Sequence, residues 1–164
     1  MQSTTASAEL INLLCDAVTR ELQVSVQYMM QHAIGAGRVS AGKGSAVATE
    51  QERFIASHTL YMLPGDRLKK IAITEMRHAE AISERVVLLG GEPPAQPAAI
   101  IIGSTAQEML ANDQEQERSA IELYTRIIAA AQGMQDTITA KLFQGILAEE
   151  QGHHHVFTRL LGEG

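Results

Sequence analysis

The sequence carries one arrangement of potential metal-binding side chains twice. In each copy a glutamate is followed seven residues later by a tyrosine, and a Glu-x-x-His motif comes further along the chain. The first copy comprises Glu21, Tyr28, Glu75 and His78, and the second comprises Glu117, Tyr124, Glu150 and His153. On an α-helix, residues spaced by about seven or about three positions lie on one face. Helices packed with these faces inward would bring the carboxylates and imidazoles together, which predicts a site for two metal ions.

Length and composition favour a single helical domain that spans residues 1–164. A chain of 164 residues is long enough to bury a sizeable core. It is 45% apolar but only 4% aromatic, and it contains no tryptophan, which suits a helical bundle better than a β-sandwich. Its net charge of −6 provides no basic surface field, so we expect no nucleic-acid partner.

Cysteine content and apolar runs predict a cytoplasmic protein that does not enter a membrane. Cys15 is the only cysteine, so the sequence has no disulfide framework of the kind found in small secreted domains. Residues 1–8 lack the basic and then apolar pattern of a signal peptide. The longest strongly apolar stretch, residues 98–102, is far too short to span a bilayer.

Glycine and proline positions divide the chain into four predicted long helices. These cover about residues 7–34, 66–89, 105–131 and 136–161. The first connection is rich in glycine, serine and alanine, and residues 50–63 within it are apolar enough to form a short helix. The second connection carries three prolines and is long enough to cross from one end of a bundle to the other. We therefore predict an all-α four-helix bundle with an extended first connection and a long crossover between the second and third helices.

The predicted inward faces are apolar except where the glutamates interrupt them. An unpaired buried carboxylate costs on the order of several kcal/mol, and several together would repel one another. Two divalent cations would offset these charges, and carboxylate-rich ligation suits iron, with manganese possible, better than zinc or copper. We expect each metal to have its own glutamate and histidine, and two further glutamates to bridge the metals. The terminal glutamates are Glu21 and Glu117, the histidines are His78 and His153, and the bridging residues are Glu75 and Glu150.

Each of these features also has a simpler explanation. A lone Glu-x-x-His motif is more often surface charge than a metal site, and a lone tyrosine is more often a core residue than an electron donor or a hydrogen-bond donor to a ligand. The metal prediction therefore rests on both motifs occurring twice in the same order. Within the run of residues 153–155, only His153 has a glutamate three positions before it. Glu115 and Glu149 lie off the predicted faces, and we expect them to be solvated.

These motifs resemble those of bacterioferritins, a family within the ferritin-like di-iron bundles. The clearest segment is Glu75-Met76-Arg77-His78-Ala79, followed by Glu84-Arg85 and by Gly90-Gly91-Glu92-Pro93. The segment Glu149-Glu150-Gln151-Gly152-His153 is similar as well. The likeness covers most of the first predicted helix and the chain from the second helix to the end of the fourth.

The resemblance implies a ferroxidase that stores or detoxifies iron. Fe(II) would bind as a pair and be oxidised by O2 or H2O2, with Tyr28 and Tyr124 beside it, and ferric mineral would be deposited inside an oligomeric shell. The resemblance also implies a b-type or related haem shared between two subunits, with Met76 of each as an axial ligand. Met76 is one residue, about 100°, off the metal-binding face, so it would point towards a neighbouring subunit.

Two departures from the family's pattern affect the expected shell. Glu21 and Glu75 are 54 residues apart, whereas Glu117 and Glu150 are 33 residues apart. The first connection, roughly residues 35–63, is therefore extended, and it could contact a neighbouring subunit. No fifth helix is predicted after residue 161, so the chain resembles a shortened bacterioferritin. These features are compatible with dimers that assemble into a shell of either 12 or 24 subunits.

Three other classes of protein use a similar bundle. A di-iron hydroxylase similar to demethoxyubiquinone hydroxylase would use the same ligands, and it would need an apolar substrate channel that Met29, Ile34 and Phe54 could line. A rubrerythrin-like peroxidase is disfavoured because Ala120 occupies the position of that family's additional glutamate. A bundle without metals that serves only as an interaction module is disfavoured because its buried charges would be uncompensated.

Overall fold

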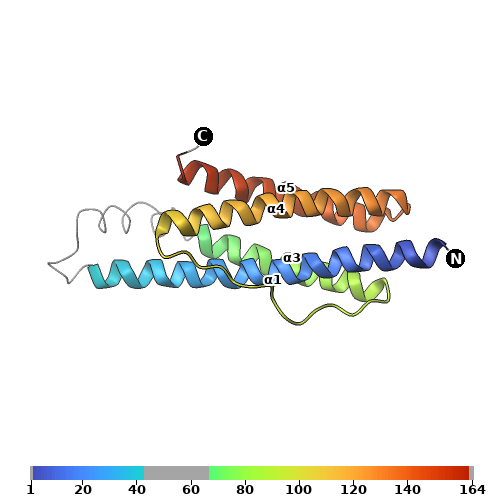
Figure 1. Cartoon of the computed structure of the whole chain (residues 1–164), viewed down its shortest axis with the longest axis horizontal. Helices are drawn as coiled ribbons and strands as arrows, with labels where there is room; N and C mark the ends of the chain where they lie inside the picture. The colour runs from blue at the N-terminus through green and yellow to red at the C-terminus, as the bar shows by residue number, and fades with distance from the viewer. Residues whose placement is uncertain (1, 43–66, 163–164) are drawn as a thin grey trace.

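The computed structural model describes residues 2–42 and 67–162, with side chains described for residues 8–35 and 67–162. Within these ranges the chain forms four α-helices and no strand. The helices are α1 (Gln2–Gly42), α3 (Arg67–Leu88), α4 (Ala106–Gly133) and α5 (Thr137–Leu160). They lie side by side along one long axis (Figure 1). The prediction of an all-α four-helix bundle is confirmed.

The bundle consists of two antiparallel helix pairs, one from each half of the chain. α1 packs closely against α3, and α4 packs closely against α5. α1 also contacts α4, and α3 contacts α5, so the two pairs close into one bundle. α3 ends at the opposite end of the bundle from the start of α4, and residues 89–105 therefore run along its length (Figure 1). This segment is the predicted long crossover.

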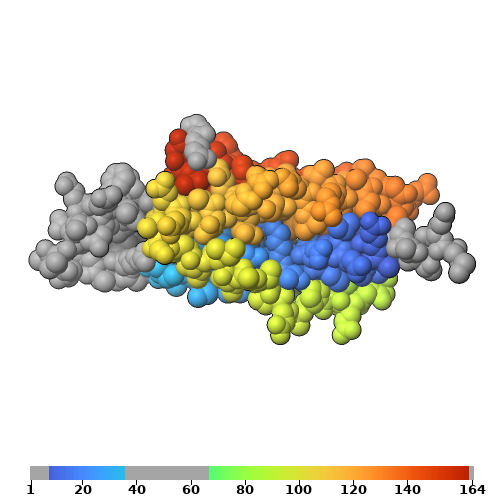
Figure 2. Space-filling model, viewed as in Figure 1, coloured from blue at the N-terminus to red at the C-terminus, as the bar shows by residue number. Residues whose placement is uncertain are grey.

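The crossover lies along the surface of α1. The backbone amide of Ala98 donates a hydrogen bond of 3.1 Å to the carbonyl of Thr19. The amide of Ile101 donates one of 3.0 Å to the side-chain oxygen of Gln27. In Figure 2 the yellow crossover covers part of the blue surface of α1. These bonds hold the crossover against the middle of the bundle.

Side-chain hydrogen bonds define where the helices of the second half begin. Thr105 and Glu108 form a capping box, in which the amide of Glu108 donates to the Thr105 hydroxyl at 3.1 Å and the amide of Thr105 donates to the Glu108 carboxylate at 3.3 Å. At the start of α5, the Asp136 carboxylate accepts hydrogen bonds from the amide of Thr139 at 3.0 Å and from Arg85 at 2.8 Å. Because Arg85 belongs to the last turn of α3, this cap also joins α3 to α5.

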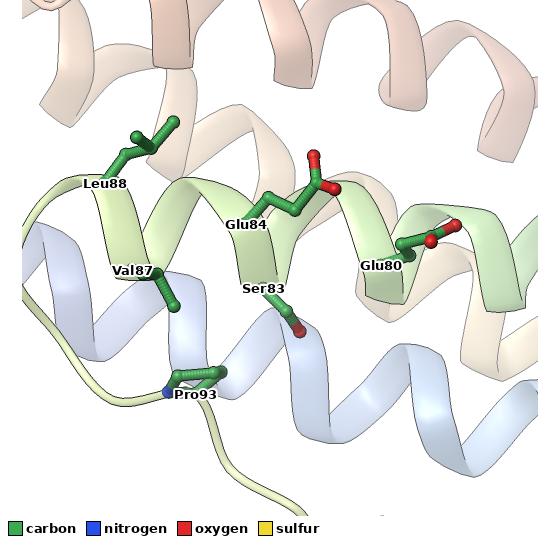
Figure 3. A pocket seen from close by; sticks show the side chains of 6 residues that line it. All are labelled: Glu80, Ser83, Glu84, Val87, Leu88 and Pro93. Carbon is green, nitrogen blue, oxygen red and sulfur yellow. The ribbon is translucent and has the colours of Figure 1, made fainter.

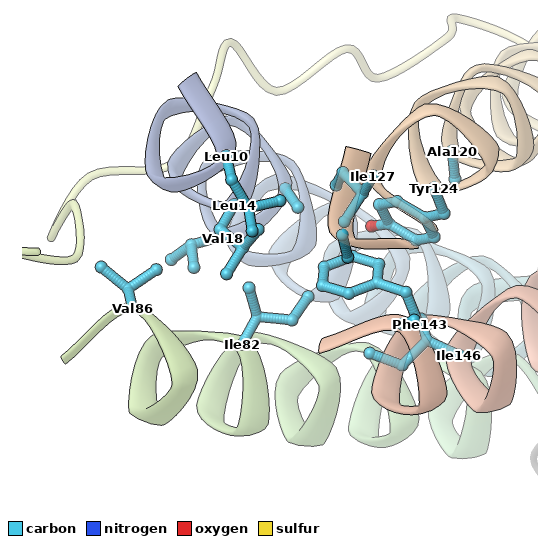
Figure 4. Close-up of a cluster of buried hydrophobic side chains, with 13 residues drawn as sticks. Leu10, Leu14, Val18, Ile82, Val86, Ala120, Tyr124, Ile127, Phe143 and Ile146 are labelled. Carbon is cyan, nitrogen blue, oxygen red and sulfur yellow. The ribbon is translucent and has the colours of Figure 1, made fainter. Parts of the chain in front are cut away.

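Two clusters of buried apolar side chains form the core, one towards each end of the bundle. The first draws on all four helices, whose side chains converge in Figure 4. It includes Leu14, Val18, Ile82, Val86, Tyr124, Ile127, Phe143 and Ile146. The second includes Val24, Tyr28, Leu68, Ile71, Met109, Leu110 and Phe157. Along each helix, the predicted metal ligands fall between the members of the two clusters, so the middle of the bundle is shielded from both ends.

The helix bounds differ from the prediction mainly in α1. We predicted an end near residue 34, but α1 continues through Gly35 and Gly37 to Gly42. A glycine costs about 1 kcal/mol relative to alanine in a helix, which weakens the helix without removing its backbone hydrogen bonds. The predicted short helix at residues 50–63 and most of the extended first connection lie outside the described residues. No helix of the described ranges has the length and apolar character needed to cross a membrane.

A buried polar cluster ties α4 to α1 and, through α1, to the crossover. The Asp113 side chain is fully buried, and its Oδ1 accepts hydrogen bonds of 2.9 Å from the side-chain amides of Gln27 and Gln31. Gln27 in turn accepts the bond from Ile101 described above. Burial raises the pKa of Asp113 to about 7, although the two amide donors act in the opposite direction.

We predict that Asp113→Asn makes the stability of the metal-free protein less dependent on pH. The folded protein holds a proton on Asp113 up to about pH 7, whereas the unfolded chain releases it near pH ~4. Stability from this group is therefore complete below pH ~4 and falls as the pH rises towards 7, by at most about 4 kcal/mol. The drop in melting temperature between about pH 5 and about pH 8 should be smaller in the variant than in the wild type.

Asp136→Asn is the control for this comparison. Burial acts to raise the pKa of Asp136, but hydrogen bonds from Thr139 and Arg85 lower it overall, so this group titrates below the tested range. The control should melt at a lower temperature at both pH values and keep the wild-type difference between them. An Asp113→Asn protein that also kept the wild-type difference would contradict the prediction.

Candidate metal centre

All six predicted metal ligands lie in the middle of the bundle. They are Glu21 on α1, Glu75 and His78 on α3, Glu117 on α4, and Glu150 and His153 on α5. On α1, Glu21 lies between Val18 of the first apolar cluster and Val24 of the second. The four glutamates are 0% exposed, His78 is 6% exposed, and the side chain of His153 is 14% exposed. The carboxylates are therefore inside the protein, as the metal prediction requires.

The ligand atoms fall into two groups, and each group could hold one metal ion. The first group is Glu21, Glu75, His78 and Glu150, and the second is Glu75, Glu117, Glu150 and His153. Within each group the carboxylate oxygens and imidazole nitrogens all lie within 4.8 Å of one another. Glu75 and Glu150 belong to both groups, whereas the other residues belong to one. This geometry suits two bridging carboxylates, while ligation itself stays a prediction.

Both histidines direct Nδ1 towards the shared carboxylates. The Nδ1 atom of His78 lies 2.9 Å from Oε1 of Glu150 and 3.1 Å from Oε2 of Glu75. The Nδ1 atom of His153 lies 2.7 Å from Oε1 of Glu75 and 3.9 Å from Oε2 of Glu150. The two rings are stacked, with 6.5 Å between their centroids. Each histidine thus faces the pair of carboxylates from its own side.

The two predicted tyrosines hydrogen-bond across the bundle to a glutamate of the other half. Tyr28 donates to Oε1 of Glu117 at 2.5 Å. Tyr124 donates to Oε1 of Glu21. Both side chains are fully buried, and each ring packs against a phenylalanine of α5. Each tyrosine therefore fills the core with its ring and holds a candidate terminal ligand with its hydroxyl.

Several buried atoms of this cluster have no hydrogen-bond partner. They are Oε2 of Glu21, Oε1 of Glu75, Oε2 of Glu117, both carboxylate oxygens of Glu150 and Nδ1 of His153. The approach of His153 to Glu75 is short enough for an ion pair but lacks hydrogen-bond geometry, so both atoms count as unpartnered. A buried polar atom without a partner costs about 1–3 kcal/mol, and more when it is charged. Coordinated cations would satisfy these atoms, so the donor set fits a pair of metal ions.

Burial raises the pKa of all four glutamates in the metal-free protein. The pKa of Glu21 rises to about 7, through burial first and then through the charge of Glu75. Burial, and then the close approach of the Glu150 carboxyl group, raises the pKa of Glu117 well above its usual value. The pKa values of Glu75 and Glu150 are raised by burial as well. Burial alone would lower the pKa of His78, but contacts with three of the carboxylates raise it.

Arg20 is a charged residue of the site that the sequence analysis did not single out. It is only 8% exposed, and its Nη1 and Nη2 atoms lie 3.5 Å from Oε1 of Glu21 and 4.0 Å from Oε2 of Glu117. Its guanidinium carbon lies 5.9 Å from the ring centroid of Tyr124, and Nη2 donates to the carbonyl of Gln116. The sequence does contain a signal for this residue, because an arginine lies on the buried stripe of α1 between a buried alanine and a buried valine.

Glu149 also lies closer to the site than predicted. Its side chain is 57% exposed, yet its Oε2 atom lies 3.2 Å from Nε2 of His78. A carboxylate on the outer nitrogen of a metal-binding histidine orients that ring. The prediction that Glu149 is simply solvated was therefore incomplete. Glu115, by contrast, is exposed and accepts a 2.8 Å hydrogen bond from Arg118, as expected for surface charge. The two other histidines of residues 153–155 belong to neither ligand group.

Comparison with known proteins places this bundle in a family. The Ferritin-like domain family matches residues 65–164. The bacterioferritin of Mycolicibacterium paratuberculosis is 31% identical over 146 residues, which cover 88% of this chain and 79% of that protein. The chain belongs to the bacterioferritin family. The resemblance inferred from the sequence motifs is thereby confirmed.

Other bacterioferritins match over shorter stretches or by structure. The Desulfovibrio desulfuricans protein is 40% identical over 87 residues, which cover 52% of this chain and 49% of that protein. The chain therefore spans about half the length of this relative. A solved structure of the same bacterioferritin, described with its di-iron site in different catalytic states, has a TM-score of 0.75 and 29% identity, and covers 98% of this chain and 82% of that chain. Mycobacterium tuberculosis bacterioferritin has a TM-score of 0.74 at 25% identity, with coverage of 94% and 85%.

We predict that divalent metal stabilises this bacterioferritin and that Glu150→Gln largely removes the effect. Co(II) at about 100 times its Kd should stabilise the folded state by about 2.7 kcal/mol per site. For a chain of this size that raises the melting temperature by at least ~5 °C. Because Glu150 belongs to both ligand groups, its replacement should reduce the shift by more than half.

Glu115→Gln is the control for the metal-stabilisation measurement. Glu115 is exposed and lies in neither ligand group, so this variant should show the full wild-type shift. Thermal denaturation with and without Co(II) measures all three proteins. An equal shift in Glu150→Gln and the wild type would show that Glu150 does not bind the metal.

Proposed function

We propose that this bacterioferritin binds a pair of iron ions at the six ligands, oxidises Fe(II) with O2 or H2O2, and stores the ferric product as mineral in an oligomeric shell. The supporting observation is the pair of ligand groups that share Glu75 and Glu150. Their unpartnered buried atoms suit cations, and their oxygen-rich composition suits iron, with manganese as a second possibility. Membership of the bacterioferritin family points to the same chemistry.

Each ligand has a distinct role in this proposal. Glu21 and Glu117 would be terminal ligands, His78 and His153 would each supply one nitrogen to a metal, and Glu75 and Glu150, which belong to both ligand groups, would be shared by the pair. The bound pair would supply two electrons to O2 or to peroxide, which neither the glutamates nor the histidines can do.

The protein's own side chains position and shield this centre. Tyr28 and Tyr124 hold the terminal carboxylates through their hydroxyls, and each is also placed to donate an electron. Glu149 holds the ring of His78 from its outer nitrogen. The two apolar clusters exclude water from both ends of the site. These contacts would hold the ligands in position for metal binding.

A haem site on the outer face of α3 is a further part of the proposal. Met76 follows the candidate ligand Glu75 directly, but its side chain is 54% exposed. Ile73, one turn earlier, is 39% exposed. An exposed thioether beside an apolar side chain suits a b-type or related haem that is shared with Met76 of a second subunit.

The outer face of α3 also has a surface suited to a neighbouring subunit. A hollow of about 580 Å³ is lined by Glu80, Ser83, Glu84, Val87, Leu88 and Pro93. Figure 3 shows these side chains on the outside of α3 and beside the start of the crossover. Val87 and Leu88 are 58% and 75% exposed, and a second copy of the chain would bury them. We propose dimers of this kind as the units of a 12- or 24-subunit shell in the cytoplasm, without nucleic-acid or membrane partners.

A di-iron hydroxylase is the second candidate function. It requires an apolar channel to the metals, for which the sequence suggested Met29, Ile34 and Phe54. Met29 and Ile34 instead pack against the second apolar cluster, and Phe54 lies outside the described residues. The structure therefore gives this candidate less support than iron storage.

Iron oxidation and particle size together test the proposed function. We predict that the purified protein elutes as a large closed oligomer and that air converts anaerobically added Fe(II) to ferric iron well beyond two ions per chain. The oligomer should keep this iron on gel filtration, as measured by absorbance and iron analysis. A monomer or dimer that stops at two ions per chain would instead favour the hydroxylase.

The same assay tests the tyrosines. Tyr28→Phe and Tyr124→Phe each remove one hydrogen bond to a terminal glutamate and preserve the ring that packs in the core. Two ions per chain should still bind, while the initial rate of Fe(II) oxidation should fall by about threefold or more. Unchanged rates in both variants would leave the tyrosines with packing roles only.

The haem proposal predicts a red protein whose Soret band depends on Met76. Met76→Leu preserves the apolar volume and removes the thioether, so the Soret absorbance should fall to background while the oligomer persists. Met134→Leu is the control, because Met134 is also exposed but lies at the end of α4. A band that survives Met76→Leu would exclude Met76 as the ligand.

A further inference from the structure

The buried charge of Arg20 is unusual for a site that is built to bind cations. Its guanidinium group is held from three directions, by the carbonyl of Gln116, by the ring of Tyr124 and by the carboxylates of Glu21 and Glu117. With 8% exposure it is not a surface group that can turn away into solvent. Arg20 is therefore a permanent positive charge beside the two terminal carboxylates.

Arg20 donates one long hydrogen bond, of 3.5 Å from Nη1 to Oε1 of Glu21, and it leaves the second oxygen of each terminal carboxylate without a partner. The Oε2 atom of Glu117 lies 4.0 Å from Nη2 and has no hydrogen-bond partner. The Oε2 atom of Glu21 is unpartnered as well, and so is Nε of Arg20. The arginine thus acts on this cluster mainly through its charge, and it leaves these two Oε2 atoms available to bind metal.

The formal charges show the consequence. Four carboxylates and one guanidinium carry a net charge of −3, and two divalent ions bring this to +1. Without the arginine, the same two ions would leave the site neutral. Since charges separated by a few ångströms inside a protein interact strongly, Arg20 must weaken the binding of cations to the adjacent carboxylates.

The internal repeat shows that this charge is present in one half only. Arg20 precedes Glu21 on α1, and Gln116 precedes Glu117 at the equivalent position of α4. The two positions lie side by side, because Arg20 donates to the carbonyl of Gln116. A neutral residue is therefore compatible with a position of this kind, which makes Arg20→Gln a mild replacement.

We propose that Arg20 is a built-in counter-ion that keeps divalent metals exchangeable at this centre by lowering their affinity and speeding their release. In the metal-free protein it compensates part of the carboxylate charge, and in the loaded protein it repels the metals. The centre then passes iron onwards in place of retaining it permanently. This inference rests on the proposed function only in taking the six residues as metal ligands.

The test measures Co(II) binding and release in the full-length oligomer. Arg20→Gln and Arg20→Met remove the charge, and both should bind Co(II) at least tenfold more tightly than the wild type. Both should also release it to excess EDTA at least tenfold more slowly, as followed by Co(II) absorbance. Arg20→Lys keeps a positive charge and should stay within about threefold of the wild type.

The direction of the change distinguishes this role from a structural one. If Arg20 merely held the site together, its removal would loosen the ligands, weaken Co(II) binding and speed its release. Equal or faster release from both neutral variants would therefore overturn the inference. Arg118→Gln is the control, because Arg118 is exposed on α4 and pairs with Glu115 and Glu122 outside the centre.

The design also covers three specific cases. If a neutral variant folds only with metal present, it is refolded with Co(II), and the EDTA release rate alone gives the comparison. If the wild type binds no Co(II), the proposed metal function fails. If the wild type binds two ions per chain and the neutral variants release them at the wild-type rate, only the role of Arg20 fails.

Discussion

The attraction between buried carboxylates and cations is the interaction on which this structure depends. Glu21, Glu75, Glu117 and Glu150 are fully buried at the middle of the bundle, between its two apolar clusters. Without compensation, each would need a proton or a partner, and their raised pKa values show how strongly burial disfavours the charge. Metal ions bound at the centre would remove this cost. The apolar clusters on either side of the centre can then pack as in any helical bundle. Packing of the apolar core therefore depends on compensation of the carboxylates at the metal centre.

The internal repeat explains how a single chain builds this centre. Each half supplies one antiparallel helix pair with a terminal glutamate, a tyrosine and a Glu-x-x-His motif. The halves interlock because Tyr28 bonds to Glu117 and Tyr124 bonds to Glu21. Neither half would have a complete ligand group alone, since both groups need Glu75 and Glu150. The crossover makes this possible by returning the chain along α1 before α4 begins.

Spacing along the helices was enough to predict the bundle and the grouping of the six candidate ligands, because helical periodicity determines which residues share a face. It was not enough for residues that reach the site from the edge of a face. Glu149 extends from an exposed position to His78, and Arg20 reaches Glu117 on another helix. Such contacts depend on side-chain length and on the neighbouring helix, which periodicity does not describe. The end of α1 was misplaced for a different reason, since glycine weakens a helix without ending it.

The departures from internal symmetry carry information that the repeated motifs do not. A site selected only to hold two cations tightly would gain from neutral residues at both positions that precede a terminal glutamate. The chain has glutamine at one and a buried arginine at the other, and the arginine is fixed by contacts with both halves. A buried charge that opposes ligand binding costs stability in the loaded state, so its presence requires a compensating benefit. Release of the bound ions is a benefit that fits a protein whose proposed task is to move iron through the centre.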